Sequence, residues 1–514
     1  MTDSAIQQKN TSRFEPFAAA FVCILAAFIV YSSALSNAFL FDDSTFLAES
    51  REWIEGRKSL FSLRPFGYFR PVWSAYVGIL ESVFGLNPVP YFIFGILIHG
   101  FNGFVIYCIA RKIELSRAAS WVAALLFITF FSHSEATLWM ASHNSSLCAG
   151  FCALALLTHI TNIKDARYYK SIATGILVLL ALFTKETGIT VVGWLVVADV
   201  SLRGPRGFLR RLMTRAAAVR YSCILAALGI FILTNDRFYV SLRGEQWGTD
   251  SMAGLGNITI ARVLGAFPIL YSPIGTVPGA TFPWTGAALF AGFSTIVLIY
   301  RKIVIKTGLF AFAIAAVALL PVCTTMFQHH ASSRLYYFPT FGAALMAGVI
   351  ADVAFTKRWG AAAFMILTLV FAAVSMRSIV QLNELYYKPF SQMQTESAQS
   401  VRPFFSDTAE TTLHLIDPPI DNIMHLRNFL VLYFGIPWEW VAQSKQPATE
   451  FAAWADAERA KGAAAIGWIE GKWTWITGPP PPSKPALRAA LSLSGPAFEP
   501  SEELSIYTIY WKPD

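Results

Sequence analysis

Residues 16–46 read PFAAAFVCILAAFIVYSSALSNAFLFDDSTF, an apolar run followed by a pair of acidic side chains. The part from 16 to 36 has no charged residue, and an α-helix needs about 20 predominantly apolar residues to cross a bilayer. It is too long for the apolar core of a cleavable signal peptide, so we interpret it as a retained signal anchor. Asp42 and Asp43 follow at the expected water–lipid boundary. A carboxylate placed there can take a proton from a polar substrate while the lipid side holds an apolar one.

The rest of the chain has the composition of a polytopic membrane protein. Of its 514 residues, 55% are hydrophobic and 14% are charged, and the mean hydropathy is +0.49. A stretch at 258–275 contains Pro268 and Pro273 and either crosses the membrane or enters and returns. Eleven further segments have the character of spans: 16–36, 88–110, 117–132, 145–160, 171–184, 186–200, 219–235, 283–300, 307–323, 336–355 and 359–377. We therefore predict an all-α polytopic membrane domain of 11–13 spans over residues 16–380.

Basic residues collect in alternate loops and predict the orientation of the spans. Lys9 and Arg13 precede the first span, whereas the loop at 132–144 has no Lys or Arg. Positively charged loops stay cytoplasmic, so residues 1–15 are expected inside and the first long loop, 37–70, outside. The net charge of +8 is explained by these juxtamembrane residues, and no nucleic-acid partner is expected. Basic residues in loop 37–70, Arg70 among them, break the rule: either a long loop tolerates them or they meet an anionic substrate.

Residues 381–514 differ from the preceding spans, because charges, prolines and short apolar runs alternate there. We predict a small soluble α/β domain on the external side. Its predicted strands are Thr411–Ile416, a strand pair within Gly467–Ile476 and Leu504–Trp511, and its predicted helices are Asn422–Phe434 and Phe451–Lys461.

Two groups of polar residues near the spans have the chemistry of a catalytic base and a phosphate site. Either Asp42 or Asp43 could act as the base, but a helix cap in front of Ser44 is an equal alternative. Lys185 and Glu186 lie between two short spans, where lysine suits a phosphate as a point charge. The alternative is an ion pair that closes a tight helix hairpin.

Two further groups are expected on the same external face. The first comprises His329, His330, Arg334, Tyr336 and Tyr337; its arginine suits a phosphate, and the histidines suit a phosphate or a metal. Interfacial anchoring is the alternative.

The second group is His133 and Glu135 in the loop at 132–144. The two residues could form an acid/base pair or a metal-binding pair, but such residues more often belong to an ordinary polar loop. No spaced set of ligands indicates a metal site, so no cofactor is assigned, and a divalent metal stays an open alternative.

The order of these segments resembles the GT-C membrane glycosyltransferases. The resemblance is greatest to the protein O-mannosyltransferase-like group, which includes transmembrane mannosyltransferases with C-terminal helical repeats. The matching pieces are Phe41-Asp-Asp, Arg70-Pro71, Gly85-Leu-Asn-Pro88, His99-Gly-Phe-Asn102, His133-x-Glu-Ala136, Trp139, Thr184-Lys-Glu-Thr187 and Arg334-Leu-Tyr-Tyr-Phe-Pro339.

The resemblance implies a GT-C-like fold and transfer of a sugar from a polyprenyl-phosphate donor on the external face. It makes Asp42 the general base with Asp43 in support, and it places the lipid phosphate on Lys185 and Arg334. His330 is expected beside that phosphate. The supporting residues are expected to be His133, Glu135, Glu186, His329 and Tyr336.

The chain departs from the family at two places. Ser142-His143-Asn144 stands where the family often has Gly-Arg-Asn, and the helical-repeat tail is absent. The second departure leaves the acceptor open among a protein, a glycolipid and a polysaccharide, and it favours a bacterial inner-membrane enzyme with a periplasmic catalytic face. The rival class is a transporter or lipid flippase, for which Glu81 and Asp199 are the best candidate residues. An inactive scaffold is a third alternative.

Overall fold

The computed structural model describes most of the membrane domain and the strands that follow it. The described residues are 14–40, 42–62, 69–203, 214–235, 269–272, 291–296, 298–325, 333–400, 412–416, 441–447, 457, 464–469, 472–475 and 503–510. The chain divides into two compact units that are interleaved in sequence. The first unit comprises Met1–Leu35, Tyr68–Trp73 and Pro90–Leu382, and the second comprises Ser36–Gly67, Ser74–Val89 and Asn383–Asp514.

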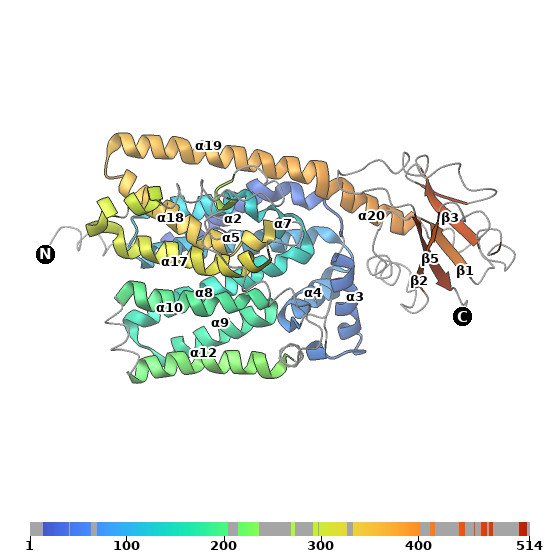
Figure 1. Ribbon diagram of the computed structural model, residues 1–514, viewed down its shortest axis with the longest axis horizontal. Coiled ribbons are helices and arrows are strands. Elements are labelled where there is room, and N and C mark those ends of the chain that lie inside the picture. The colour runs from blue at the N-terminus through green and yellow to red at the C-terminus, as the bar shows by residue number, and fades with distance from the viewer. Residues whose placement is uncertain are drawn as a thin grey trace. The chain divides into compact units, whose positions relative to one another are not determined.

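The first unit is built from helices (Figure 1). Its long helices are α2 (Glu15–Tyr31), α5 (Pro88–Lys112), α6 (Arg117–Thr129), α8 (His143–Asp165), α9 (Tyr168–Thr184), α10 (Thr190–Arg203), α12 (Arg215–Thr234), α17 (Arg301–Thr325), α18 (Pro339–Ala354) and α19 (Arg358–Leu382). Short elements connect them: η4 (Phe131–His133), α7 (Ser134–Leu138), η5 (Met140–Ser142), η6 (Glu186–Ile189) and η7 (Ser333–Tyr336).

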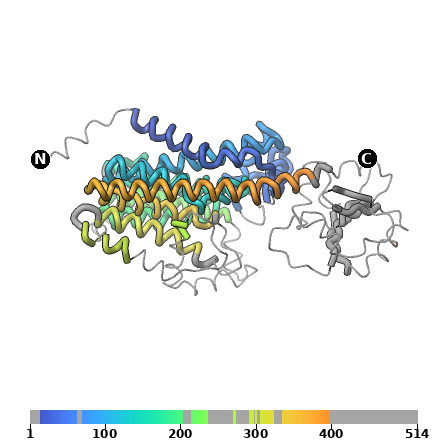
Figure 2. Tube along the Cα trace, turned by 90° about the horizontal axis from the view of Figure 1, so that it is seen from above, coloured from blue at the N-terminus to red at the C-terminus, as the bar shows by residue number. Residues whose placement is uncertain are grey.

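These helices pack as a continuous series. α12 lies on α9, α9 on α8, α8 on α10, α10 on α17, α17 on α18 and α18 on α6. Seen from above, α19 runs in the same general direction as its neighbours (Figure 2). Capping side chains begin two of the helices: the Ser116 hydroxyl accepts from the Ala119 amide at α6, and the Thr214 hydroxyl accepts from the Ala217 amide at α12.

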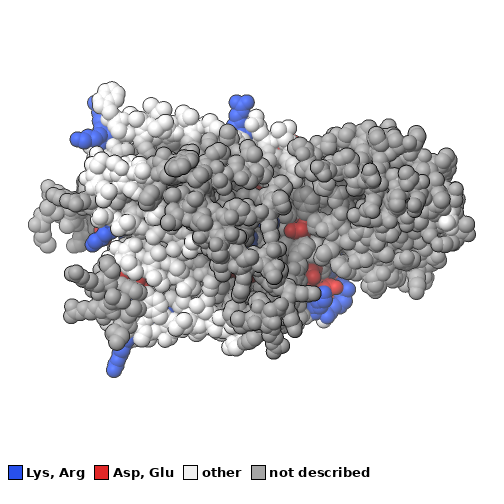
Figure 3. Space-filling model, viewed as in Figure 1, with Lys and Arg blue, Asp and Glu red and all other residues white. Residues whose placement is uncertain are grey.

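The surface of this unit is apolar along its helices. Trp359 is 86% exposed and Leu367 67% exposed on α19. In Figure 3 the described surface of the unit is largely uncharged, and Lys and Arg side chains project mainly at its left-hand end. An apolar band of this kind suits a bilayer, and the chain is an integral membrane protein.

Fewer spans are found among the described residues than the 11–13 predicted. Six helices are long and apolar enough to cross a membrane, or seven if the pair Arg117–Thr129 and Phe131–Leu138, bent by 53°, is one span. α9 and α18 are apolar but shorter; 17 residues of helix, the length of α9, extend about 25 Å, less than a typical hydrocarbon core of about 30 Å. Most of the stretch at 258–275 lies outside the described residues.

The second unit combines short helices with a five-stranded sheet. Its helical elements include α3 (Asp43–Ile54), η2 (Leu60–Ser62), η8 (Asn383–Tyr387) and α20 (Lys388–Ser400). The strands are β1 (Thr412–Ile416), β2 (Val441–Pro447), β3 (Ala464–Ile469), β4 (Lys472–Trp475) and β5 (Glu503–Tyr510).

The sheet has the order β2-β5-β1-β3-β4. β1 and β3 are parallel, and the other neighbours are antiparallel, with Leu415 opposite Tyr507 and Ile466 opposite Trp475. Strands lie at the three places where the sequence predicts them, and β2 is additional. The predicted helices Asn422–Phe434 and Phe451–Lys461 lie outside the described residues apart from Ala457, so the α/β assignment stays a prediction.

Candidate active site

Lys185 is a buried lysine at the point where α9 ends. Its backbone is extended, with φ −162° and ψ 143°, and this breaks the helix before η6. The Cys148 thiol donates to the Ala181 carbonyl at 3.2 Å and thereby ties the last turn of α9 to α8. The ammonium group donates to the Ser145 hydroxyl on α8 at 2.6 Å, and only 9% of the residue is exposed. Within the described chain, no carboxylate lies at ion-pair distance from it.

Glu186 is paired with Arg70 and not with its neighbour Lys185. Nε and Nη2 of Arg70 donate to the two carboxylate oxygens at 3.2 and 2.8 Å, the bidentate geometry that arginine favours. Arg70 is 8% exposed. The alternative of a Lys185–Glu186 ion pair is therefore wrong, because the extended backbone sends these adjacent side chains to different partners. Sequence reasoning placed Arg70 among the external basic residues that could meet an anionic substrate, but it did not predict the pairing with Glu186.

Arg334 lies on η7 and contacts the segment between α7 and α8. Its Nε is 3.5 Å from a Glu135 carboxylate oxygen, and its backbone amide donates to the same carboxylate at 3.2 Å. Nη1 donates to the Ser142 hydroxyl at 3.3 Å, and the guanidinium carbon lies 4.9 Å from the centre of the Trp139 ring. The Ser142 position, where the chain departs from the family pattern, is thus a direct contact of Arg334.

Lys185, Arg70 and Arg334 form a cation cluster. Burial, and after it the charges of Arg334 and Arg70, lower the pKa of Lys185 to about 7, while Glu186 acts in the opposite direction. Each arginine has a carboxylate partner, but Lys185 has only the Ser145 hydroxyl among the described residues. The cluster carries one more positive charge than its two carboxylates balance, so it is suited to hold an anion.

A buried aromatic cluster supports the segment that carries Arg334. The Tyr337 hydroxyl lies 2.7 Å from Nδ1 of His99 and accepts from the Asn102 amide at 3.0 Å. Its ring packs against Phe341, with ring centres 6.2 Å apart. These contacts hold the start of α18, and with it the adjacent η7, against α5.

His133 belongs to this aromatic cluster. The residue is fully buried; its Nε2 lies 2.6 Å from the Thr340 hydroxyl, and its ring centre lies 4.4 Å from that of Tyr337. The neighbouring Glu135 contacts Arg334 instead. Residues 131–142 therefore form short, mostly buried helices, and the predicted polar loop is wrong because their apolar side chains pack inward. The described residues contain no group of three potential metal ligands.

The other predicted members of this region are placed only in part. Tyr336 is 1% exposed and lies beside the aromatic cluster in sequence. His329 and His330 lie outside the described residues. The functional roles of these three residues stay predictions.

Asp42 and Asp43 lie in the second unit and occupy different environments. Asp43 is fully buried, and its carboxylate accepts from the Leu40 amide at 2.8 Å. Asp42 is half-buried at the N-cap position of α3, where its side chain makes no capping hydrogen bond. The helix-cap alternative thus does not apply to the Asp42 side chain, whereas Asp43 stabilises the turn that leads into α3.

The segment before this pair is held by η8 and α20 of the same unit. The Asn37 amide donates to the Asn383 side chain at 2.8 Å, and the Ala38 amide donates to the Ser391 hydroxyl at 3.0 Å. Thr395 donates to the Phe39 carbonyl at 3.5 Å. These contacts over more than 340 positions have no signature in the sequence.

No protein-family model matches the chain. Among curated proteins, it is 24% identical over 182 residues to the protein O-mannosyl-transferase Tmtc1 of Drosophila melanogaster and 25% identical over 234 residues to the protein O-mannosyl-transferase TMTC4 of Homo sapiens. These matches cover 33% and 38% of this chain but only 21% and 31% of the two relatives. The chain resembles the GT-C membrane glycosyltransferases. This resemblance agrees with the ordered motifs.

Solved structures of GT-C glycosyltransferases are also similar to the chain. ArnT from Cupriavidus metallidurans, bound to undecaprenyl phosphate, is 14% identical with a TM-score of 0.49, over 97% of this chain and 98% of that chain. The Archaeoglobus fulgidus oligosaccharyltransferase, tethered with an acceptor peptide, is 12% identical with a TM-score of 0.47, over 74% of this chain and 57% of that chain.

Proposed function

We propose that this GT-C-like protein transfers a sugar from a polyprenyl-phosphate donor to an acceptor hydroxyl. The observation that carries the proposal is the buried Lys185, which has no carboxylate partner among the described residues and lies within electrostatic reach of Arg70 and Arg334. A buried cation without a counter-ion is costly, and a bound phosphate would supply that counter-ion. The similarity to protein O-mannosyl-transferases supports the same class of reaction.

The cation cluster would stabilise the leaving group. As the bond between the anomeric carbon and the phosphate oxygen breaks, negative charge grows on the phosphate. Lys185 would contact it as a point charge, and Arg334 as a planar donor held over Trp139. Arg70 would contribute its charge while it keeps Glu186 in place. His330, with His329 nearby in sequence, stays a predicted additional phosphate contact.

Asp42 is proposed as the general base. It would accept the proton of the acceptor hydroxyl while that oxygen attacks the anomeric carbon, and polyprenyl phosphate would leave. A single displacement of this kind inverts the anomeric configuration. Asp43 would support the base by holding the turn before α3 through the Leu40 amide.

The remaining parts of the proposal concern location and partners. The reaction would take place on the external face of a bacterial inner membrane, with the region from 381 to 514 as a periplasmic α/β domain. The acceptor would be a protein, a glycolipid or a polysaccharide, and no cofactor is assigned.

Transfer of label from a radiolabelled polyprenyl-phosphate sugar tests the roles separately. Asp42→Asn should abolish transfer while donor binding and folding persist, because the base is lost and the phosphate site is intact. Lys185→Ala and Arg334→Ala should each weaken donor binding about tenfold or more, since each removes a charge-assisted contact. Lys357→Ala removes an exposed lysine and should leave both readouts unchanged.

Normal turnover by Asp42→Asn would refute the base, and unchanged donor binding in both cation variants would refute the phosphate site.

Movement of the labelled lipid across the membrane without bond cleavage would favour the flippase. In the structure, the rival's candidate residues are both engaged: Glu81 pairs with Arg51 at 2.9 Å, and Asp199 lies 2.9 Å from His159. Proper folding with no donor binding at all would favour the scaffold.

A further inference from the structure

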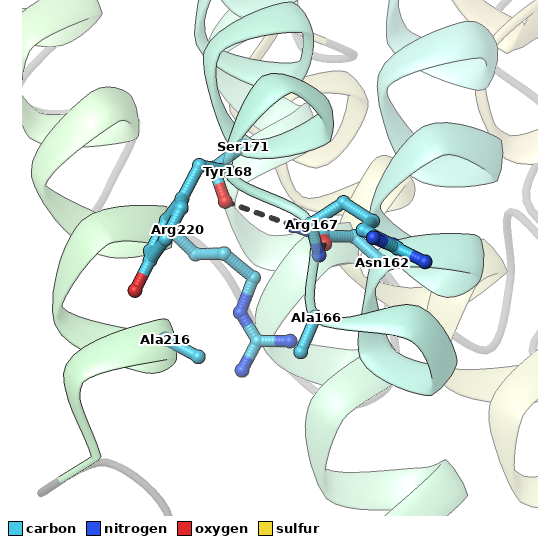
Figure 4. Close-up of a pocket in the computed structure, with 7 residues that line it drawn as sticks. All are labelled: Asn162, Ala166, Arg167, Tyr168, Ser171, Ala216 and Arg220. Atoms are coloured by element: carbon cyan, nitrogen blue, oxygen red, sulfur yellow. Dashed lines mark hydrogen bonds between the residues drawn. The ribbon is translucent and has the colours of Figure 1, made fainter.

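A small pocket lies at the end of α9 that is remote from Lys185 (Figure 4). It is lined by Asn162, Ala166, Arg167, Tyr168, Ser171, Ala216 and Arg220. These residues come from the end of α8, the start of α9 and the first turns of α12. The 17 residues of α9 span about 25 Å, so the pocket is well removed from the cation cluster.

Arg220 is a buried guanidinium whose hydrogen-bonding capacity is not used up. It is 4% exposed, and its Nε has no hydrogen-bond partner among the residues that the structure describes. Figure 4 shows the side chain extending from α12 toward the turn at Ala166. Its Nη2 lies 3.9 Å from a carboxylate oxygen of Asp199, a long ion pair. A buried unsatisfied donor of this strength indicates a missing acceptor.

The other polar groups of the pocket are also donors. The Asn162 amide donates to the Ser171 hydroxyl at 2.9 Å, and the Ser171 proton has no acceptor in the described part of the chain. The Asn162 carbonyl oxygen is taken by the Arg167 amide at 2.8 Å. The N-terminus of α9 has no side-chain cap, so its first amides and helix dipole favour an anion there.

The carboxylates around the pocket are already engaged. Asp165 pairs with Lys170. Asp199 accepts from Tyr221 at 2.8 Å and lies 2.9 Å from His159, and its other carboxylate oxygen lies 3.9 Å from Arg220. Arg167 is exposed and has no carboxylate at ion-pair distance among the described residues. The charge left over at the pocket mouth is therefore positive.

Size and surroundings indicate which anion fits. The enclosed part of the pocket has room for about one water molecule, and the rest of its empty space, about 170 Å³ in all, opens to solvent. One oxygen of a phosphate group can enter the enclosed part while the rest of the group stays at the open mouth. From Tyr168 at its edge, an exposed apolar stripe follows α9 at every fourth residue: Tyr168 is 60%, Ile172 53% and Ile176 54% exposed.

We propose that this pocket binds the phosphate headgroup of an anionic membrane lipid, with an acyl chain along Tyr168, Ile172 and Ile176. The headgroup phosphate accepts hydrogen bonds from Arg220, Ser171 and the start of α9, and Arg167 adds charge at the mouth. Basic pockets between membrane helices recognise anionic lipids through this combination of a buried cation and an adjacent apolar groove.

Native mass spectrometry of the purified full chain tests the site with phosphatidylglycerol and phosphatidylcholine of identical acyl chains. The wild type should retain phosphatidylglycerol preferentially. Arg220→Gln should reduce that preference about tenfold, because a charge-assisted contact is lost. Arg215→Gln removes an exposed charge from the same helix outside the pocket and should leave the preference unchanged.

A second pair of variants keeps every charge and guards against misfolding of Arg220→Gln. Ala216→Leu fills the pocket and should reduce the preference similarly, whereas Ala218→Leu on the exposed side of α12 should not. The proposal fails if Arg220→Gln and Ala216→Leu both bind phosphatidylglycerol like the wild type. It also fails if Arg215→Gln reduces the preference for phosphatidylglycerol as much as Arg220→Gln does. It also fails if inorganic phosphate displaces the lipid at low millimolar concentration, which would identify a free-phosphate site. Lys185→Ala should retain the preference for phosphatidylglycerol. If this variant were the only one to lose the preference, the lipid would bind at the cation cluster and not at the pocket.

Discussion

At the scale of single residues, the buried Lys185 controls the electrostatics of the cation cluster. Among the described residues its ammonium group donates only to a serine hydroxyl, and the charges of Arg334 and Arg70 outweigh that of Glu186, so its protonated form is stabilised only weakly before an anion binds. A bound phosphate would reverse this situation and raise the pKa of the lysine. Under the proposed function, binding of the donor is therefore expected to be linked to uptake of a proton.

This linkage predicts a pH dependence of donor binding. Burial and the adjacent arginines lower the pKa of Lys185 to about 7 in the empty site. Below that pH the lysine is already charged and affinity is maximal. Above it, binding must protonate the lysine first, so affinity should fall by up to about tenfold per pH unit until the pKa of the bound state is reached. Donor titrations between pH 6 and 9 measure this.

Lys185→Arg is the matched control, because arginine stays charged over the whole range. Its affinity is expected to be lower, since a larger group must fit beside Ser145, but nearly independent of pH. An equally steep decline in this variant would assign the titration to another group.

At the scale of secondary-structure elements, helix packing depends on glycines at close crossings. A Cβ atom added at Gly342 on α18 would lie 2.2 Å from the Ala315 backbone nitrogen on α17. Backbone atoms cannot move aside as a flexible side chain can, so this crossing allows only glycine. It matters for the site, because α18 directly follows η7 and Arg334.

We predict that Gly342→Ala destabilises the protein by about 1–3 kcal/mol through overpacking. Gly229→Ala on α12 is the matched control, since nothing lies within 4 Å of its added Cβ. That change should be neutral or stabilising by up to about 1 kcal/mol, because alanine favours helix. Unfolding of both variants in detergent measures the difference. Equal stability would show that α17 and α18 separate at little cost.

At the scale of the whole molecule, the second unit is assembled from three distant parts of the chain. Residues 36–67, 74–89 and 383–514 form it, and the Asn37–Asn383 hydrogen bond at 2.8 Å links the first part to the third. Asn37 is 2% exposed and Asn383 is fully buried. The turn that carries Asp42 and Asp43 is therefore held by residues from η8 and α20.

Asn383→Ala should loosen that turn, because it leaves the buried Asn37 amide without this partner, at a cost of about 1–3 kcal/mol. Hydrogen exchange at residues 37–43 should become faster. Glu384→Ala on the same element removes only an exposed pair with Lys388 and should leave this exchange unchanged. Unaltered exchange in Asn383→Ala would mean that other contacts suffice to hold the turn.

Much of the fold is predictable from local properties of the chain. Apolar length predicted α2, α5 and α19 because a span needs a continuous run. Strand-like composition, and at the last strand the alternation of period two, predicted three strand positions. The motifs around Lys185 and Arg334 predicted a phosphate site for a similar reason, because a charge beside a span is costly unless it is paired or has a function, and that role stays a prediction.

The partners of these residues could be seen only in the folded chain. The sequence does not tell that Glu186 pairs with Arg70, that His133 lies in an aromatic cluster, or that Asn383 holds the turn before Asp42. Fewer spans are found among the described residues than predicted for a related reason, since an apolar window does not reveal where the backbone breaks or where a helix stays short. Hydrophobicity and charge are properties of each residue and its sequence neighbours. Hydrogen bonds and ion pairs between distant residues depend on which surfaces the packed helices bring together.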